Sequence, residues 1–242
     1  MPDALFAIPR LAGLYDPLEA GRGDLDAYVA MVGEFGARRV LDVGCGTGVL
    51  ALMLAERGVE VVGVDPALAS LEIARAKRGA ERVRWVHGDA GALPPLQVEL
   101  AVMTGNVAQV FVGDEEWAAT LGAVRRALVA GGRFVFETRD PGREAWLGWN
   151  REETYSRIEL PGIGVVEHWT DLLEVRLPLV KFKRTYVFAK DGATLVSEST
   201  LRFRSRGEVE ESLTRAGFVL DEVRDAPDRP GLEFVFVARR VD

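Results

Sequence analysis

The chain has 242 residues, of which 48% are hydrophobic, so it can bury one substantial core and shows no sign of a second. Thirty basic residues face 37 acidic ones, and the resulting net charge of −7 disfavours binding to a nucleic-acid backbone. No apolar run approaches the roughly 20 residues of a membrane helix, and a signal-peptide pattern is absent from the first residues. We therefore expect a cytoplasmic protein that binds neither nucleic acid nor a membrane.

The first part of the chain predicts a covering segment and then a helix. Residues 1–22 place apolar side chains among prolines and glycines, a composition that suits a segment lying over the fold. Apolar residues then recur at helical spacing over residues 25–35. We expect a helix there, ahead of the first strand.

A short apolar strand next runs into a glycine-rich turn. The strand carries Asp42 near its carboxyl end, and the turn has glycines at every second position, namely Gly44, Gly46 and Gly48. Glycines at this spacing let backbone N–H groups approach a ligand without obstruction by a Cβ atom. The helix expected over residues 47–57 points its positive end at the same place, so we expect the turn to bind a ligand with a polar head.

Two further strands lead into acidic residues. The strand over residues 61–65 ends in Asp65, about 20 residues beyond the glycines, where a carboxylate can accept both hydrogen bonds of a ribose diol. The strand over residues 83–87 is followed by Asp89. Because parallel strands bring their carboxyl ends to one edge of a sheet, both carboxylates are expected on the same rim as the glycine turn.

Taken together, the segments LDVGCGTG, VVGVDPA and WVHGDA resemble the successive motifs of the class I S-adenosylmethionine-dependent methyltransferases. The resemblance implies S-adenosylmethionine as the methyl donor. It implies that the three glycines surround the methionine part with Asp42 beneath them, that Asp65 takes the ribose hydroxyls, and that Asp89 accepts from the adenine amino group. The other donor-binding residues that it implies are Cys45, Thr47, Pro66, Ala90, Thr104 and Asn106.

No metal site is expected. The chain has one cysteine, Cys45, and two histidines, His87 and His168. These residues provide neither a thiolate cluster nor a helical histidine pair. Cys45 also has no partner for a disulfide, so we interpret it as a small loop residue.

The following elements alternate between strand and helix, which is typical of parallel crossover units. The fourth strand ends at residues 103–106, the helix over 115–129 is expected to stop at the glycine pair 131–132, and the fifth strand covers 131–137. A terminal strand pair is expected around residues 215–218. The predicted fold is α/β, with a Rossmann-like doubly wound sheet that is mostly parallel and has an antiparallel terminal strand.

Residues from about 153 to 205 carry no helical period and predict an antiparallel β-meander inserted after the fifth strand. Alternate residues of its third strand are apolar, so one face is expected to be buried. Within a single domain over residues 1–242, the meander is expected to form a lid over the acceptor or a platform where two copies pair. Its four strands are expected over 154–160, 164–176, 179–188 and 194–204.

The sequence favours a small acceptor without identifying it. The exit of the fourth strand, Thr104-Gly105-Asn106-Val107, lacks the Asn-Pro-Pro-Tyr tetrapeptide of many relatives that methylate nucleobases or amide nitrogens. Ligands of open parallel sheets bind outside the carboxyl ends of the strands, so acceptor contacts are sought there and in the covering segments. The candidates for acceptor binding are Tyr15, Asn106, Arg139 and Trp169, and those for catalysis are His168, as general base, and Asp140.

Three functions stay open. The favoured one transfers a methyl group from S-adenosylmethionine to an oxygen or nitrogen of a small organic acceptor by in-line displacement, mainly through positioning. The alternative is a non-catalytic module that binds S-adenosylmethionine or S-adenosylhomocysteine. A nicotinamide oxidoreductase is disfavoured, because the dinucleotide fingerprint requires a third glycine where Val49 stands.

Overall fold

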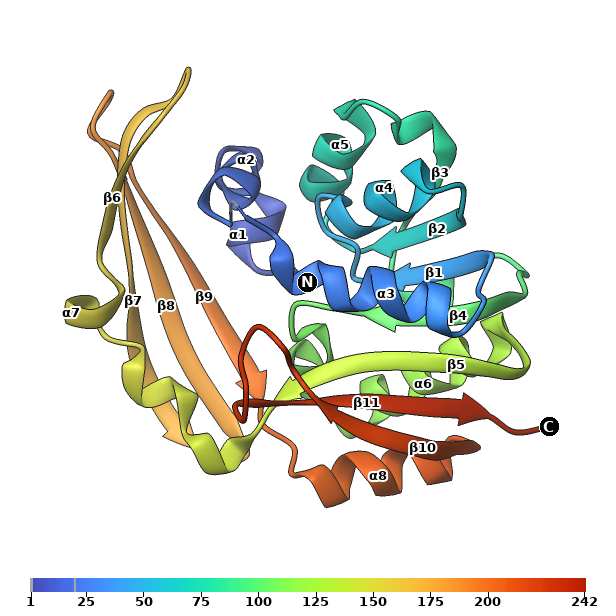
Figure 1. Cartoon of the computed structure of the whole chain (residues 1–242). Coiled ribbons are helices and arrows are strands. Elements are labelled where there is room, and N and C mark those ends of the chain that lie inside the picture. Colours follow the sequence, from blue (N-terminus) through green and yellow to red (C-terminus); the bar gives the residue numbers. More distant parts are fainter. Residues whose placement is uncertain (1, 20) are drawn as a thin grey trace.

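The structure, a computed structural model, describes residues 2–19 and 21–242 and contains two β-sheets (Figure 1). The larger sheet has the strand order β10-β11-β5-β4-β1-β2-β3. Its first five strands in sequence are parallel, whereas β11 runs antiparallel to both β5 and β10, which confirms the predicted Rossmann-like sheet. Its strands are β1 (Arg39–Val43), β2 (Glu60–Asp65), β3 (Val83–His87), β4 (Val98–Met103), β5 (Leu128–Arg139), β10 (Phe218–Asp225) and β11 (Glu233–Arg240).

Helices cover both faces of this sheet. Successive side chains of a strand point to opposite faces, so Val40 of β1 packs with α3 and α4 while Leu41 packs with α6 and α8. The strands are apolar on both faces for that reason, as is usual for a parallel sheet. The helices are α1 (Ala4–Ala7), α2 (Pro9–Leu18), α3 (Asp26–Glu34), α4 (Val49–Glu56), α5 (Leu68–Ala76), α6 (Asp114–Ala127), α7 (Arg151–Thr154) and α8 (Arg206–Arg215).

The prediction that the glycine pair Gly131-Gly132 stops a helix is wrong. Helix α6 already ends at Ala127, and the glycines lie inside β5. Gly131 has a φ of 73°, and the pairing of β4 with β5 shifts its register just there. A Cβ atom on Gly132 would lie 2.9 Å from the carbonyl oxygen of Val129, so the pair allows an irregularity in the strand.

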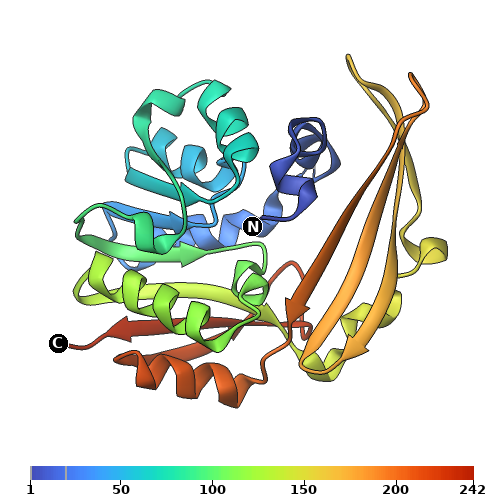
Figure 2. The ribbon, with the colours of Figure 1, turned by 180° about the vertical axis from the view of Figure 1, so that it is seen from behind.

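The second sheet is the predicted meander. Its strands pair antiparallel in chain order, and Figure 2 shows the sheet standing beside the main body, reached from β5. Register places His168, Arg184 and Tyr186 on one face, here called the inner face, and Trp169 on the opposite, outer face. The strands are β6 (Ser156–Leu160), β7 (Gly164–Arg176), β8 (Leu179–Phe188) and β9 (Thr194–Arg202).

Helices α1 and α2 lie between the inner face of the meander and the main body (Figure 1). Leu11 and Leu14 of α2 are fully buried in a cluster with Tyr186 and Phe188 of β8. On the other side, the backbone carbonyl of Phe6 accepts a hydrogen bond from Ser70 of α5. The predicted covering segment, residues 1–22, thus contacts the meander on one side and helix α5 of the main body on the other. Met1 and Ala20 of this segment lie outside the described residues.

Candidate functional site: a glycine turn and its acidic rim

The glycine turn joins β1 to α4. The backbone N–H groups of Gly44 and Cys45 both donate to the carbonyl of Val64 in β2, at 2.8 and 3.2 Å. Gly44, Gly46 and Gly48 all have positive φ values, of 73°, 53° and 78°. The turn therefore needs glycine at these positions for its backbone conformation.

The three glycines differ in what surrounds them. A Cβ atom on Gly48 would lie 2.4 Å from the ring of Trp85, and one on Gly44 would lie 2.7 Å from Val107. A Cβ atom on Gly46 would meet nothing within 4 Å. Gly48 and Gly44 thus allow close packing inside the protein, whereas Gly46 leaves open space above the turn.

Asp65 fastens the turn from the end of β2. Its two carboxylate oxygens accept hydrogen bonds from the backbone N–H groups of Gly46, at 2.8 Å, and Ala67, at 2.7 Å. The side chain is buried, and burial raises its pKa despite these two hydrogen bonds. Asp65 therefore fixes the position of Gly46 and keeps free lone pairs for a ligand.

Asp42 lies at the carboxyl end of β1 and is almost completely buried, with 1% of its surface exposed. Its Oδ1 atom has no hydrogen-bond partner among the described residues. Burial, aided by the nearby charge of Asp65, raises the pKa of Asp42 to about 7. A buried carboxyl without a partner is costly, and a cationic ligand group is what would stabilise its charged form.

The end of β3 completes the rim. Asp89 is exposed, and its Oδ1 accepts from the backbone N–H of Gly91 at 2.8 Å, while the neighbouring Ala90 is buried. Pro66, just beyond β2, is exposed, and its carbonyl lies 3.2 Å from Nε2 of His87. The structure thus brings the glycine turn, Asp65 and Asp89 to the carboxyl ends of three adjacent strands.

Asp16 of α2 reaches this rim from the covering segment. Its carboxylate accepts from the hydroxyl of Thr47 and forms an ion pair with Lys77. Lys77 also donates to the backbone carbonyl of Thr47, at 2.7 Å. Sequence reasoning missed Asp16 and Lys77, since no local pattern links residues separated by 61 positions in the chain.

A second buried polar cluster lies where β4, β5 and β11 meet. Glu137 accepts from the backbone N–H groups of Gly105 and Asn106, and the amide of Asn106 donates to Glu233 at 3.0 Å. Burial and the charge of Glu233 raise the pKa of Glu137 to about 7. Thr104, which directly follows β4, is partly exposed beside this cluster. Glu137 is an acidic residue near the carboxyl end of β5, a signal that the sequence carries, whereas no such signal marks Glu233.

Arg139 and Asp140 leave this cluster at the end of β5. Arg139 donates to Oε1 of Gln109 at 2.9 Å and lies 3.9 Å from Glu233. Asp140 caps the following turn, since its Oδ1 accepts from the N–H of Gly142 at 2.9 Å. Arg139 is thus directed at the polar cluster, while Asp140 is occupied in local structure.

The meander contributes the inner-face residues. His168 is half-buried and stacks on Tyr186 with ring centroids 5.9 Å apart; burial and the charge of Arg184 lower its pKa. The ring of Tyr15 packs on Phe6 within the same apolar cluster. The structure does not bring Trp169 to this face, because its indole donates to Asp171 and lies under Arg151 on the outer face.

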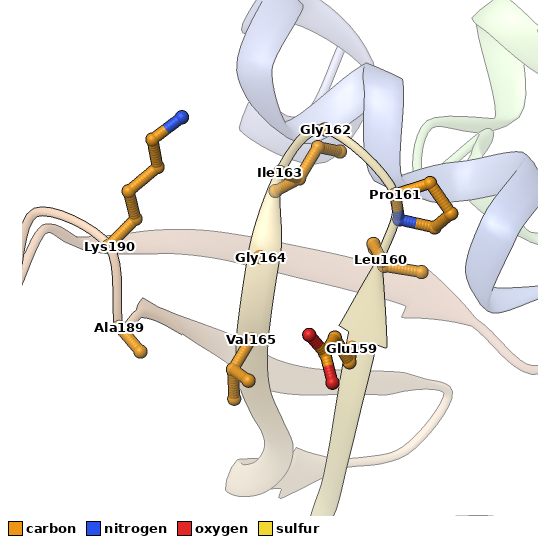
Figure 3. A pocket seen from close by; sticks show the side chains of 9 residues that line it. All are labelled: Glu159, Leu160, Pro161, Gly162, Ile163, Gly164, Val165, Ala189 and Lys190. Carbon is orange, nitrogen blue, oxygen red and sulfur yellow. The ribbon is translucent and has the colours of Figure 1, made fainter.

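A surface hollow lies elsewhere, on the meander. A cavity of about 770 Å³ occurs at the tip of the meander and is lined by residues 159–165 with Ala189 and Lys190 (Figure 3). Most of these residues are apolar or glycine, and Glu159 and Lys190 are its charged members. The hollow is remote in sequence and sheet from the acidic rim, so we do not assign the site there.

Residues 40–132 match a family described as a methyltransferase domain. The chain is 36% identical over 125 residues to a cypemycin N-terminal methyltransferase from a Streptomyces species, covering 51% of each protein. It is 39% identical over 136 residues to a demethylmenaquinone methyltransferase from Thermus thermophilus, covering 54% of this chain and 60% of that protein. These matches span 51% to 60% of the curated relatives' length.

A solved structure of a sugar N-methyltransferase from a Streptoalloteichus species shares the fold, with a TM-score of 0.76 at 21% identity over 94% of this chain and 93% of that one. The matched domain contains the glycine turn, Asp65 and Asp89. Residues 40–132 are thus similar to a methyltransferase domain, and the chain shares the fold of a solved methyltransferase. Strands β6 to β9 lie outside the matched residues and follow β5 in the chain.

Two further observations concern metal ions and membranes. Within residues 2–19 and 21–242, no group of three or more histidine, cysteine, aspartate or glutamate side chains is arranged to hold a metal ion. Over the same residues, no helix is both long enough and apolar enough to span a membrane.

Proposed function

We propose that this methyltransferase moves a methyl group from S-adenosylmethionine to an oxygen or nitrogen of a small organic acceptor. The observation that carries the proposal is the carboxyl group of Asp42, buried beneath the glycine turn with one oxygen lacking a partner. The methionine part of the donor carries an ammonium group, which would complete the hydrogen bonding of this carboxylate. The open space above Gly46 supports the same placement.

The remaining donor contacts follow from the rim. Asp65 keeps lone pairs for the ribose hydroxyls while it holds Gly46 and Ala67. Asp89 and Ala90, with Pro66 just beyond the adjacent strand β2, border the place proposed for adenine. Cys45, Thr47 and Gly48 shape the turn, and Thr104 and Asn106 border it at the end of β4.

The donor supplies an electrophilic methyl group and a neutral leaving group. The protein's part is then to hold the acceptor atom roughly 3 Å from that methyl group and in line with it, a contribution worth about 7–11 kcal/mol of barrier. An acceptor that still holds its proton needs a base. We propose His168 for this role, because its lowered pKa keeps the imidazole neutral at pH 7 and it lies on the inner face.

Calorimetric titration with S-adenosylmethionine, S-adenosylhomocysteine and NADH tests the donor site. We expect micromolar binding of the first two and none of NADH. The Asp65→Ala variant is expected to bind the donor more weakly by roughly 1.5–3 kcal/mol, the usual loss of hydrogen bonds to a charged group. Binding of NADH alone, or no binding by folded protein, would refute the proposal.

A non-catalytic binding module is the second candidate. It predicts the same donor titration but no labelled methyl transfer from S-adenosyl-[methyl-³H]methionine to any small molecule of a metabolite extract.

We place the reaction in the cytoplasm, a proposal supported by the single buried, unpaired cysteine.

We also propose that two copies pair through the outer face of the meander. Val196 on that face is 41% exposed, and it lies across Thr185 from Trp169. The rest of this face carries charged pairs such as Asp171 with Lys183, so we propose that Val196 and Trp169 supply the apolar part of the contact. A monomer in sedimentation equilibrium at 50–100 μM, on the order of the concentration that populates weak dimers, would refute this pairing.

A further inference from the structure

Two guanidinium groups from different sheets flank one aromatic pair at the junction of the main body and the meander. The ring centroids of Trp149 and Phe182 lie 4.7 Å apart. The guanidinium carbon of Arg139, at the end of β5, is 5.9 Å from the ring of Trp149. That of Arg184, on β8, is 5.7 Å from the ring of Phe182. Both cations therefore border the space beside this pair.

The carboxylates nearby do not balance these cations. Glu233 lies 3.9 Å from Arg139, but it is held more closely by Arg229, at 2.8 Å. Among residues 2–19 and 21–242, no carboxylate comes within 4.0 Å of the Arg184 guanidinium. Glu137 carries only part of a negative charge at pH 7, because its pKa is about 7. The region keeps an excess of positive charge.

The pKa of Arg139 reflects this excess of positive charge. Burial and the neighbouring charges of Arg229 and Arg184 lower the pKa of Arg139 to about 10, although Glu233 opposes the shift. Like charges held this close are stabilised by an anion placed between them. Arg184 also acts on two aromatic neighbours: burial and the charge of Arg184 lower the pKa of His168, whereas burial raises the pKa of Tyr15 against the opposing charge of Arg184.

An unpaired donor lies beside Arg139. The side chain of Gln109 is buried, and its Oε1 accepts from Arg139. Its Nε2 has no hydrogen-bond partner in the described part of the chain. A buried donor left unpaired costs about 1–3 kcal/mol, so an oxygen of a ligand at this place would remove that cost.

We propose that Arg139 and Arg184, with Nε2 of Gln109, form an oxyanion subsite that binds a carboxylate or phosphate group of the methyl acceptor. The inference rests on the proposed function, since it narrows the acceptor to an anionic molecule. It gives the meander a direct part in acceptor choice, because Arg184 comes from β8. A planar guanidinium binds such groups through two parallel hydrogen bonds, which a lysine cannot form.

The test uses protein saturated with S-adenosylhomocysteine, titrated separately with acetate and with inorganic phosphate. Arginine Nε–H resonances in ¹H–¹⁵N spectra report binding, and the two anions distinguish a carboxylate site from a phosphate site. We expect saturable millimolar binding of at least one anion. Arg184→Gln is expected to weaken it about tenfold or more, and Arg184→Lys less, because the charge remains.

Arg157→Gln is the matched control. Arg157 lies on the outer face of the meander with 60% of its side chain exposed, so the variant makes the same charge change away from the subsite. Unsaturable shifts with both anions, or equal weakening by Arg157→Gln, would overturn the inference. The S-adenosylhomocysteine titration is read separately, so a failed donor site is distinguished from a failed oxyanion subsite.

Discussion

The carboxylate of Asp16, in the covering helix α2, accepts a hydrogen bond from the hydroxyl of Thr47, in the glycine turn. The same carboxylate pairs with Lys77, which donates to the backbone carbonyl of Thr47. The covering segment is thereby fastened to the turn that is proposed to bind the donor. Its opposite side is bonded to the meander, where the N–H of Leu5 donates to Ser197 at 2.9 Å. One segment thus connects the glycine turn with the meander.

Replacing Asp16 by alanine is expected to loosen the covering segment and to weaken binding of S-adenosylhomocysteine about tenfold. The physical reason is that the Thr47 hydroxyl is buried and loses its partner, a loss of about 1–3 kcal/mol. Calorimetry gives the affinity, and hydrogen exchange of residues 2–18 gives the loosening. Asp191→Ala is the control, since it removes the exposed ion pair of the same segment with Arg10, together with a turn hydrogen bond from Ala193, and leaves Thr47 untouched. Equal affinities for the Asp16 variant and wild type would contradict this role.

Alanine at two glycines of the turn is expected to have different effects. Gly48→Ala places a methyl group against Trp85 and should lower the free energy of unfolding by about 1–3 kcal/mol, as overpacking does. Gly46→Ala meets no protein atom, so it should cost only the strain of its positive φ, about 1 kcal/mol, while reducing donor affinity more strongly. Urea unfolding and calorimetry separate the two quantities. A stable Gly48 variant would show that Trp85 moves aside readily.

Donor binding is expected to depend on pH through Asp42. Its pKa is about 7, so below pH 7 the carboxyl is mostly neutral and attracts the donor's ammonium group less. Affinity should therefore rise from pH 6 to pH 8, by up to about tenfold per unit below the pKa. Asp42→Asn should show weaker binding and a flat profile, while the exposed Asp228→Asn should behave like wild type. A sloped profile in the Asp42 variant would assign the dependence to another group.

The titration of Glu137 is expected to lower the free energy of unfolding as the pH rises. Its pKa is raised from 4.5 to about 7 in the folded protein, so the folded state binds more protons between these values than the unfolded state. The free energy of unfolding then falls as pH rises through this window, by about 3 kcal/mol from this group. Glu137→Gln should remove that share of the slope in urea titrations at pH 5 and pH 8.

Glu99 offers the opposite case. Hydrogen bonds from Arg39 lower the pKa of Glu99. The contribution of Glu99 to the free energy of unfolding is therefore fully present above the ordinary pKa of a glutamate, and it is lost as the pH falls through the lowered pKa. Glu99→Gln should therefore destabilise the protein at pH 8 and lose its effect in acid. If both variants changed the pH dependence of the free energy of unfolding in the same direction, the burial of Glu137 would not control its titration.

The acidic rim around the glycine turn was predictable because each part of it follows from a local sequence pattern. An apolar strand, a glycine turn and an acidic residue at a strand end are separated by a few positions, and parallel pairing necessarily brings such ends to one edge. The alternating apolar residues of β8 predicted a buried face in the same way. The prediction for the glycine pair 131–132 was wrong because a glycine pair is compatible both with the end of a helix and with an irregularity in a strand. Only the pairing of β4 with β5 decides between the two.

The sequence by itself determined the Rossmann-like sheet, the glycine turn and the carboxylates of its rim, since hydrophobic periodicity and turn chemistry act over a few neighbouring residues. Only the tertiary structure decided which face of the meander turns inward, with Arg184 and His168 on it and Trp169 away from it. It alone brought Asp16 to Thr47 and Arg139 near Arg184. Contacts between residues far apart in the chain depend on how whole elements pack, and no short-range pattern records that packing.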